Sequence, residues 1–452
     1  MKKKSISILI ILMVLLVVQA VPVFAAEDDP PKTDCGAALL MDAKTGEVLY
    51  ESNSTKAMQP ASLTKMMTAL LVVENLDMND TVTVPKEAVG ITGNNIGLKE
   101  GEVFTVEQLL NALMIYSAND AAVALGIKVS GNIDSFLALM NEKAAKLGMN
   151  DTHYISPNGL VESTSHITTA KDISIIAREV LRSKTLSKIV CKTKYTIPQT
   201  NMSKERKLKS TNKLLYDTKH KIQVNGQTRT PKYEGAEGIK TGFMNASGYC
   251  LAAAVERDGT QFIAVVMDAG TDLARYSNAI SMLDYGFDNY YTYKLMDKGA
   301  ECGRVKVKYG HNTFVQTEAA GGAYATLPKQ ASKDVAESKV SLDSNVKAPI
   351  KKGTKVGVVN IYENGEKTGT ADIVITKTVK KGGPWSAWYI SDIAFIIICA
   401  VVLLLIILLI MRGTGRKKRK RKQEFEKRKA REHRAREIAA ERADKQRREW
   451  PY

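Results

Sequence analysis

The chain has 452 residues, a length that indicates two or three domains, and its formal net charge is +17 at neutral pH. Residues 412–452 carry eighteen Lys and Arg against seven Asp and Glu, and three more lysines stand at positions 2–4, so only about +3 remains for the rest. This distribution excludes a general nucleic-acid-binding role, and the five cysteines have neither the spacing of a zinc site nor that of a disulfide framework.

The chain begins with the features of a secretory signal peptide. A lysine-rich start precedes an apolar segment at residues 6–18, and Val23 and Ala25 place small residues before a cleavage position. We predict cleavage after Ala25, so that residues 1–25 are the signal peptide and the mature fold begins near Asp34.

Hydrophobic periods typical of strands and of helices follow one another through residues 34–293. Strands are predicted at 37–42, 47–50, 81–84, 237–241, 249–256 and 261–268. Helices are predicted to begin at Ser62 and to cover 105–114, 121–129, 133–147, 168–182 and 272–283. The polar segment 217–230 is expected to be an exposed excursion. Because the helices lie between an early hairpin and a late group of strands, we expect one α/β domain whose sheet draws on both ends of the segment.

The chain beyond this domain loses the helical period. Alternating strands with an Asn364-Gly365 turn predict a small all-β domain at residues 299–381. Residues 393–411 are nineteen positions without a charge, enough to cross a bilayer as one helix. We predict a transmembrane helix at 389–411 and a basic cytoplasmic tail at 412–452, with the preceding chain outside the cell. The tail is either solvated or attracted to anionic lipid.

The stretch from Ser62 to Lys65 carries the first candidate for chemistry. A serine and a lysine three residues apart at the start of a helix share one face, and the first N–H groups surround the serine oxygen. A hydroxyl is a poor nucleophile without a base, and a lysine can be that base where burial or a second cation makes its ammonium form costly. The spacing also fits a serine cap followed by an exposed lysine, so this motif alone does not distinguish a catalytic pair from an ordinary helix start.

Two later tripeptides complete a set of three motifs, Ser117-Ala118-Asn119 between two helices and Lys240-Thr241-Gly242 at a strand end. In this order, together with Ser62 and Lys65, they resemble the motifs of the penicillin-recognising serine acyltransferases. Further stretches narrow the resemblance to the D-alanyl-D-alanine carboxypeptidases, which are low-molecular-mass penicillin-binding proteins. These stretches are residues 41–46, 155–160, 211–215, 237–242 and 248–250.

The resemblance implies a fold, a reaction and a set of partners. The fold is a β-lactamase/transpeptidase-like domain, an antiparallel five-stranded sheet flanked by helices, followed by a small β-domain and a C-terminal membrane anchor. The reaction is removal of the C-terminal D-Ala from peptidoglycan stem pentapeptides through an acyl-enzyme. The expected partners are these stem peptides, β-lactams as covalent inhibitors and the membrane, with no nucleic acid, metal or cofactor.

The same resemblance assigns the catalytic roles. Ser62 is the nucleophile, Lys65 takes the serine proton, and Ser117 relays a proton to the departing amine. Lys240, held close by, would help keep Lys65 neutral through like-charge repulsion. The backbone N–H groups of Ser62 and Phe243 would form the oxyanion hole.

It also assigns the substrate-binding roles. Asn119 would hold the substrate amide and Lys65. Lys240 and Thr241 would face the terminal carboxylate. Gly242 would let the substrate backbone lie along the strand edge. The sequence departs from the family at Met244, where a threonine that helps to bind the carboxylate is usual.

Two alternatives on the same fold stay open. A β-lactamase shares the three motifs but needs a Glu-x-x-x-Asn loop to hydrolyse its acyl-enzyme, and the sequence from Glu162 to His166 lacks the asparagine. We therefore expect a long-lived penicilloyl adduct. The other alternative is a catalytically weak penicillin-binding or wall-binding protein, which Met244 favours.

Two unrelated enzyme classes fit less well. A Ser/His/Asp hydrolase needs a histidine partner, whereas Ser62 lacks the Gly-x-Ser-x-Gly elbow and His166 is predicted to be structural. A phosphate-binding loop at 235–241 would need a glycine where Ile239 stands, and an extracellular location removes the nucleotide.

Overall fold

The computed structural model describes residues 30–161 and 163–449, and the predicted signal peptide at residues 1–25 lies outside them. The chain divides into two compact units. One consists of residues 1–295, 324–337 and 361–369, and the other of residues 296–323, 338–360 and 370–452. Each is described by itself.

The first unit is built on a five-stranded sheet with the strand order β2-β1-β11-β10-β9. Its strands are β1 (Cys35–Asp42), β2 (Val48–Ser52), β9 (Ala236–Met244), β10 (Gly248–Arg257) and β11 (Thr260–Ala269). Each neighbouring pair is antiparallel, and β1 pairs with β11 from the far end of the domain. The prediction of an α/β domain whose sheet draws on both ends of the segment is therefore confirmed.

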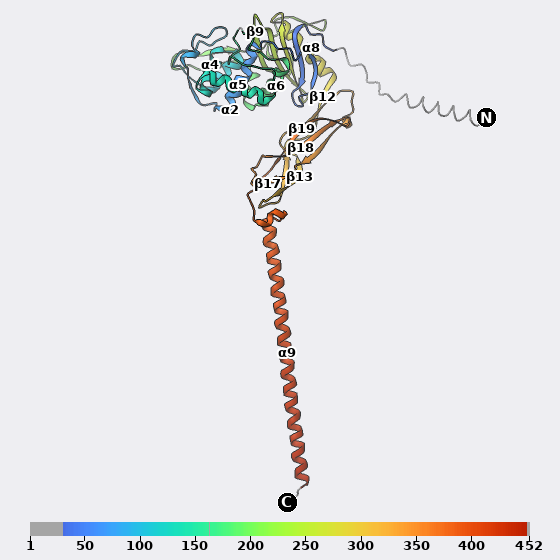
Figure 1. Ribbon diagram of the computed structural model, residues 1–452. Coiled ribbons are helices and arrows are strands. Elements are labelled where there is room, and N and C mark those ends of the chain that lie inside the picture. Colours follow the sequence, from blue (N-terminus) through green and yellow to red (C-terminus); the bar gives the residue numbers. More distant parts are fainter. Residues whose placement is uncertain (1–29, 162, 450–452) are drawn as a thin grey trace, which may run out of the picture. The chain divides into compact units, whose positions relative to one another are not determined.

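Both faces of this sheet are covered by helices, which Figure 1 shows on its two sides. In β1, Ala37 and Leu39 pack among helices α2 (Lys65–Asn75), α4 (Asn119–Ser130), α5 (Ile133–Leu147) and α6 (Ala170–Arg182). The alternate residues Ala38 and Leu40 pack on the other face with α8 (Ala274–Asn289). Because successive side chains of a strand point to opposite faces of the sheet, one run of apolar residues contributes to two separate cores.

The segments between the sheet and the helices are shorter. They comprise β3 (Thr81–Thr83), η3 (Lys86–Ala88), β4 (Val103–Thr105), α3 (Val106–Asn111), the π-helical turn η4 (Ala112–Tyr116), α7 (Lys184–Val190), β5 (Lys194–Ile197), β6 (Arg206–Lys209) and η5 (Lys213–Leu215). Thr105 caps α3 through a capping box with Gln108.

Three sequence expectations for this unit need correction. The segment 217–230 is not an exposed excursion throughout, because it contains the hairpin β7 (Ile222–Val224) and β8 (Gln227–Arg229), and Ile222 and Val224 are each only 4% exposed among the core residues of α8. Helix α8 continues to Asn289 rather than ending near Leu283. The helix that carries Ser62 begins as a 3-10 turn, η2 (Ala61–Thr64), before α2.

The chain beyond residue 299 forms the predicted all-β region. A six-stranded sheet has the order β16-β18-β19-β14-β13-β17. Its strands are β13 (Glu301–Lys308), β14 (Phe314–Ala319), β16 (Ala336–Leu342), β17 (Val346–Lys347), β18 (Lys355–Glu363) and β19 (Glu366–Ile375), while β12 (Tyr290–Met296) pairs with β15 (Ala323–Pro328). The predicted turn at Asn364 and Gly365 joins β18 to β19, with φ values of 50° and 83°.

The described residues end in the long helix α9 (Asp392–Glu449). Two short 3-10 turns come before it, η6 (Lys333–Val335) in the β-region and η7 (Pro384–Trp388) next to the helix. In Figure 1 α9 is the red helix. It is long and apolar enough to cross a membrane, so the predicted anchor at 389–411 has a helix that fits it from Asp392 on. The basic tail continues the same helix as far as Glu449.

Candidate functional site

Ser62 and Lys65 meet at the junction of η2 and α2. Lys65 Nζ lies 2.8 Å from Ser62 Oγ, and it donates to Asn119 Oδ1 at 2.6 Å and to the Asn158 carbonyl oxygen at 2.8 Å. Side chains three residues apart eclipse one another in a 3-10 turn, which explains why the serine and the lysine lie in contact. The second interpretation of this motif, an exposed lysine after a serine cap, is wrong, because Lys65 is fully buried.

The environment of Lys65 disfavours its ammonium form. Burial lowers its pKa well below the ordinary value, and the cation of Lys240 lowers it further, while the carboxylate of Asp120 opposes them. A lysine in this state can accept the proton of the hydroxyl that it contacts.

Ser117 and Lys240 form a second contact within the site. Lys240 Nζ donates to Ser117 Oγ at 2.8 Å and to the Thr241 carbonyl oxygen at 2.9 Å, and the lysine is only 1% exposed. Ser117 ends the π-helical turn η4 in a left-handed conformation with φ of 67°, which lets the chain turn before α4. Burial lowers the pKa of Lys240 to about 7, with a further contribution from the cation of Arg275.

Asn119, the first residue of α4, connects Lys65 to a loop beside the site. Its Oδ1 accepts from Lys65, its Nδ2 donates to the Thr92 carbonyl oxygen at 2.8 Å, and its backbone N–H donates to the Asn94 carbonyl oxygen at 2.7 Å. The orientation of the Asn119 amide is thus fixed on both sides.

Strand β9 supplies Thr241, Gly242 and Phe243. Thr241 Oγ1 lies 2.6 Å from Thr211 Oγ1. A Cβ atom at Gly242 would lie 3.3 Å from the Ser62 nitrogen, so the strand backbone runs directly against η2 at this point. Phe243 is 48% exposed and its ring stacks on Tyr249 at a centroid distance of 4.2 Å.

These residues open onto a cleft of about 560 Å³. Its lining consists of Ser62, Gly93, Asn94, Ser117, Asn119, Gly159, Leu160, Val161, Thr211, Thr241, Gly242, Phe243, Met244, Asn245 and Arg275. Lys65 and Lys240 lie behind it, each in hydrogen-bond contact with a lining serine. The three motifs of the sequence therefore come together at one place, which their spacing alone could not establish.

Sequence reasoning did not single out three participants. The Asn158 carbonyl accepts from Lys65, and Thr211 contacts Thr241; both lie in stretches quoted only for their resemblance to the family. Arg275 of α8 is 6% exposed, lines the cleft and donates to the Gly242 carbonyl oxygen at 3.0 Å. No local pattern marks Arg275, because its place follows from the packing of α8 under the sheet.

His166 braces the backbone, as its structural interpretation predicts. Its Nδ1 accepts from the Ile155 N–H at 3.1 Å, and its Nε2 lies 2.9 Å from Thr64 Oγ1, whose own hydroxyl donates to the Ala61 carbonyl. Burial lowers the pKa of His166 to about 4, so the ring is neutral near pH 7.

Glu162 lies outside the described residues. Within the described ranges, no three His, Cys, Asp or Glu side chains form a group that could hold a metal ion.

Comparison with known families yields two matches. The profile of the D-alanyl-D-alanine carboxypeptidase family matches residues 24–271. The profile of the C-terminal domain of penicillin-binding protein 5 matches residues 290–381.

Individual proteins give the same picture. D-alanyl-D-alanine carboxypeptidase DacF of Bacillus subtilis is 31% identical over 379 residues, which cover 82% of this chain and 93% of DacF. DacC of Escherichia coli is 28% identical over 80% of this chain and 88% of its own length. Among solved structures, penicillin-binding protein 5 of Haemophilus influenzae has a TM-score of 0.60 at 27% identity, over 78% of this chain and 100% of that one.

Proposed function

Because the chain belongs to the D-alanyl-D-alanine carboxypeptidase family of serine peptidases, we propose that it removes the terminal D-Ala from peptidoglycan stem peptides through an acyl-enzyme on Ser62. The observation that carries the proposal is the 2.8 Å contact between Ser62 Oγ and the fully buried Lys65 Nζ. A buried lysine with a lowered pKa, hydrogen-bonded to a serine that opens onto a cleft, is suited to acyl transfer.

In the first step Lys65 takes the proton of Ser62 as Oγ attacks the carbonyl carbon of the penultimate D-Ala. The carbonyl oxygen becomes an oxyanion, for which the N–H groups of Ser62 and Phe243 are the proposed donors. The close approach of β9 to η2 at Gly242 supports this pairing. Loss of one such donor typically costs about 10²–10³ in rate.

In the second step the C–N bond of the peptide breaks and the amine of the terminal D-Ala leaves with a proton relayed by Ser117. The contact of Ser117 with Lys240 supports this route, since it places the hydroxyl in a connected set of proton carriers. A water molecule then hydrolyses the ester on Ser62, and the shortened peptide leaves.

Recognition of the substrate is assigned to three residues of the second and third motifs. Lys240 and Thr241 would receive the terminal carboxylate, with a charge-assisted hydrogen bond from the lysine. Asn119, held by Thr92 and Asn94, would bind the substrate amide. The same groups would receive the carboxylate and amide of a β-lactam, which acylates Ser62.

We further propose that α9 anchors the protein in the cytoplasmic membrane with the catalytic unit on the extracellular face. The apolar first part of α9 and its basic continuation support this orientation, since basic residues are retained on the cytoplasmic side. In the sequence, the β-region beyond residue 299 stands between the residues of the site and α9.

A second candidate on the same fold is a weakly catalytic penicillin-binding protein. Met244 favours it, because this 8% exposed side chain lines the cleft where the family usually places a threonine. A β-lactamase is a third candidate, and it differs in that its penicilloyl adduct would turn over rapidly.

One experiment separates the three candidates. The full chain in detergent is incubated with diacyl-Lys-D-Ala-D-Ala and, separately, with a fluorescent penicillin. A carboxypeptidase releases D-Ala and keeps the label, a weak binding protein keeps the label without release, and a β-lactamase loses the label rapidly. Ser62→Ala should abolish both signals, whereas Ser130→Ala, at the far end of α4, should change neither; unchanged D-Ala release by Ser62→Ala would refute the proposal.

A further inference from the structure

Residues 89–102 form a loop beside the cleft and contribute to no helix or strand. Gly93 and Asn94 of this loop line the cleft. The carbonyl oxygens of Thr92 and Asn94 accept the two hydrogen bonds that fix Asn119. The position of Asn119 against Lys65 therefore depends on what holds the loop.

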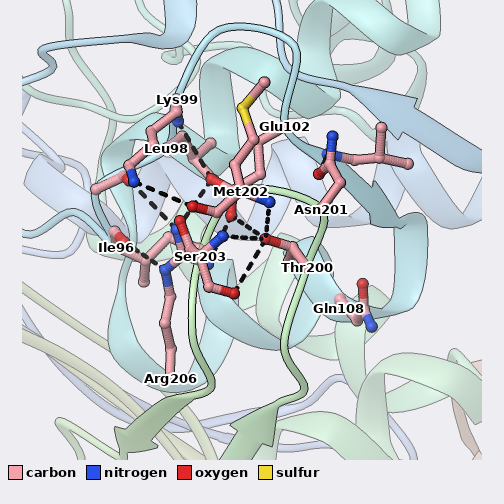
Figure 2. Close-up of polar contacts among 12 residues, drawn as sticks. Ile96, Leu98, Lys99, Glu102, Gln108, Thr200, Asn201, Met202, Ser203 and Arg206 are labelled. Carbon is pink, nitrogen blue, oxygen red and sulfur yellow. Dashed lines mark hydrogen bonds and ion pairs between the residues drawn. The ribbon is translucent and has the colours of Figure 1, made fainter.

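The Ile96 peptide group is held from both sides, as Figure 2 shows for its contact with Arg206. Asp120 Oδ2 accepts from the N–H groups of Ile96 at 3.0 Å and Leu98 at 3.2 Å. Arg206 donates from Nε to the Ile96 carbonyl oxygen at 2.8 Å and from Nη2 to the Gly97 carbonyl oxygen at 3.3 Å. Asp120 directly follows Asn119, whereas Arg206 comes from strand β6.

The guanidinium of Arg206 is itself fixed by Glu102. The two form a bidentate pair with both N–O distances at 2.9 Å, and their side chains are 14% and 0% exposed. Thr200 Oγ1 and the Lys99 N–H also donate to Glu102. Burial alone would raise the pKa of Glu102, but the hydrogen bonds from Arg206 and Thr200 outweigh it and hold the pKa below its ordinary value.

The pair also connects the loop to a second segment that lines the cleft. Arg206 is the first residue of β6, and the chain that leaves this strand reaches Thr211, which lines the cleft and contacts Thr241. The Thr211 N–H donates to the Ile115 carbonyl oxygen at 3.1 Å, just before Ser117. One largely buried ion pair thus joins two segments that line the cleft.

We propose that Arg206, held by Glu102, is a positioning residue of the acyl-transfer site: it fixes the Ile96 and Gly97 carbonyls, and through the loop it fixes Asn119 against Lys65. The inference rests on the proposed function. A lysine cannot replace this arginine, because a single ammonium cannot bind Glu102 bidentately and reach two carbonyl groups in the fixed geometry of a guanidinium.

The test is a double-mutant cycle on the rate constant for acylation of the detergent-solubilised full chain by a fluorescent penicillin. Arg206→Lys should slow acylation about 10-fold or more. If Arg206 acts through Asn119, the same substitution in an Asn119→Ala background should cost less than about threefold. A purely structural role would give the same fold-loss in both backgrounds. The matched control is Arg229→Lys, which weakens the partly buried ion pair between Arg229 and Asp284 on the α8 side, and it should stay within about twofold of wild type.

Amide hydrogen exchange gives a second readout. Arg206→Lys should accelerate exchange of the Ile96 and Leu98 amides, whereas Arg229→Lys should not. Additive losses in the cycle, or a wild-type acylation rate in folded Arg206→Lys, would overturn the inference. If Arg206→Lys does not fold, Thr200→Val replaces it in the same cycle, because this substitution removes one donor to Glu102. The acylation rate constant should then fall about two- to fivefold, and additive losses would again refute the inference. A wild-type chain that no penicillin acylates would instead refute the proposed function and the inference with it.

Discussion

Two buried clusters of charged residues lie near the cleft, and they are built in opposite ways. Lys65 and Lys240 are 0% and 1% exposed, and neither forms an ion pair with any residue in the described part of the chain. Glu102 is fully buried and the Arg206 side chain is 14% exposed, and the two neutralise one another through two parallel hydrogen bonds. The first cluster contains like charges, and the second contains opposite charges.

The two kinds of cluster serve different purposes, since one supplies a base for the reaction and the other holds the loop in position. Burial disfavours the charged form of both lysines, and a neighbouring cation adds to this effect, Lys240 for Lys65 and Arg275 for Lys240. The pKa values of both lysines therefore fall, and Lys65 becomes available as a base. A buried opposite pair keeps both charges and holds its surroundings in place, and removing one partner leaves an uncompensated charge. Changes in the first cluster should therefore alter the reaction, and changes in the second should alter stability and alignment.

The largest effect is expected for Lys65→Met. Loss of the general base should lower the penicillin acylation rate by about 10²–10⁴-fold. The control is Lys143→Met, which removes a partly exposed ion pair between α5 and Glu74 near the C-terminal end of α2 and should leave the rate unchanged. The comparison of the two clusters fails if Lys65→Met retains more than half of the wild-type rate.

Substitutions in the second cluster should mainly lower the stability of the fold. Arg206→Met leaves Glu102 buried and unpaired, which should lower the free energy of unfolding by about 3–5 kcal/mol. Replacing both partners, with Glu102→Leu added to Arg206→Met, should recover much of this loss, because no charge then remains buried. Thermal unfolding of the three proteins measures both steps, and a single variant as stable as wild type would show that the pair does not hold the loop.

A smaller kinetic effect is expected for Lys240→Gln. Loss of a charge-assisted hydrogen bond to the substrate carboxylate should lower kcat/KM about 10–100-fold for a peptide that ends in D-Ala. For the corresponding D-alaninamide, which has no carboxylate, the loss should be smaller. Equal losses with the two peptides would mean that Lys240 does not receive the carboxylate.

The smallest effect is expected for Met244→Thr. A hydroxyl at this position in the cleft could donate to the carboxylate, so turnover should be equal to or up to about tenfold higher than that of wild type. Release of D-Ala from diacyl-Lys-D-Ala-D-Ala measures it. A clear fall in turnover would show that the methionine contributes to the site.

The fold and the motif residues could be predicted from the sequence because each has a local signature. The late strands have continuous apolar runs, and Ser62, Lys65 and the two tripeptides have fixed spacings. The prediction for segment 217–230 was wrong because the segment is mostly polar. Ile222 and Val224 stand two residues apart, so both lie on the buried face of a short strand.

The second cluster had no signature that could be read in advance. Residues 89–102 follow no hydrophobic period, and Arg206 lies 104 positions from Glu102 along the chain. An arginine and a glutamate at such a distance in sequence are ordinary surface residues until the fold brings β6 beside the loop. Long-range pairs of this kind are set by tertiary packing.

The most direct test of the central claim, that Lys65 is kept neutral by burial and by Lys240, is the pH dependence of acylation by a fluorescent penicillin between about pH 5 and 10. Deprotonation of Lys65 should make the rate rise with an apparent pKa well below the ordinary lysine value of 10.5. In Lys240→Gln the neighbouring cation is gone, so the pKa of Lys65 should increase and the rise should move to higher pH. A rise in wild type near pH 10.5, or one that stays in place or moves to lower pH in Lys240→Gln, would contradict the account.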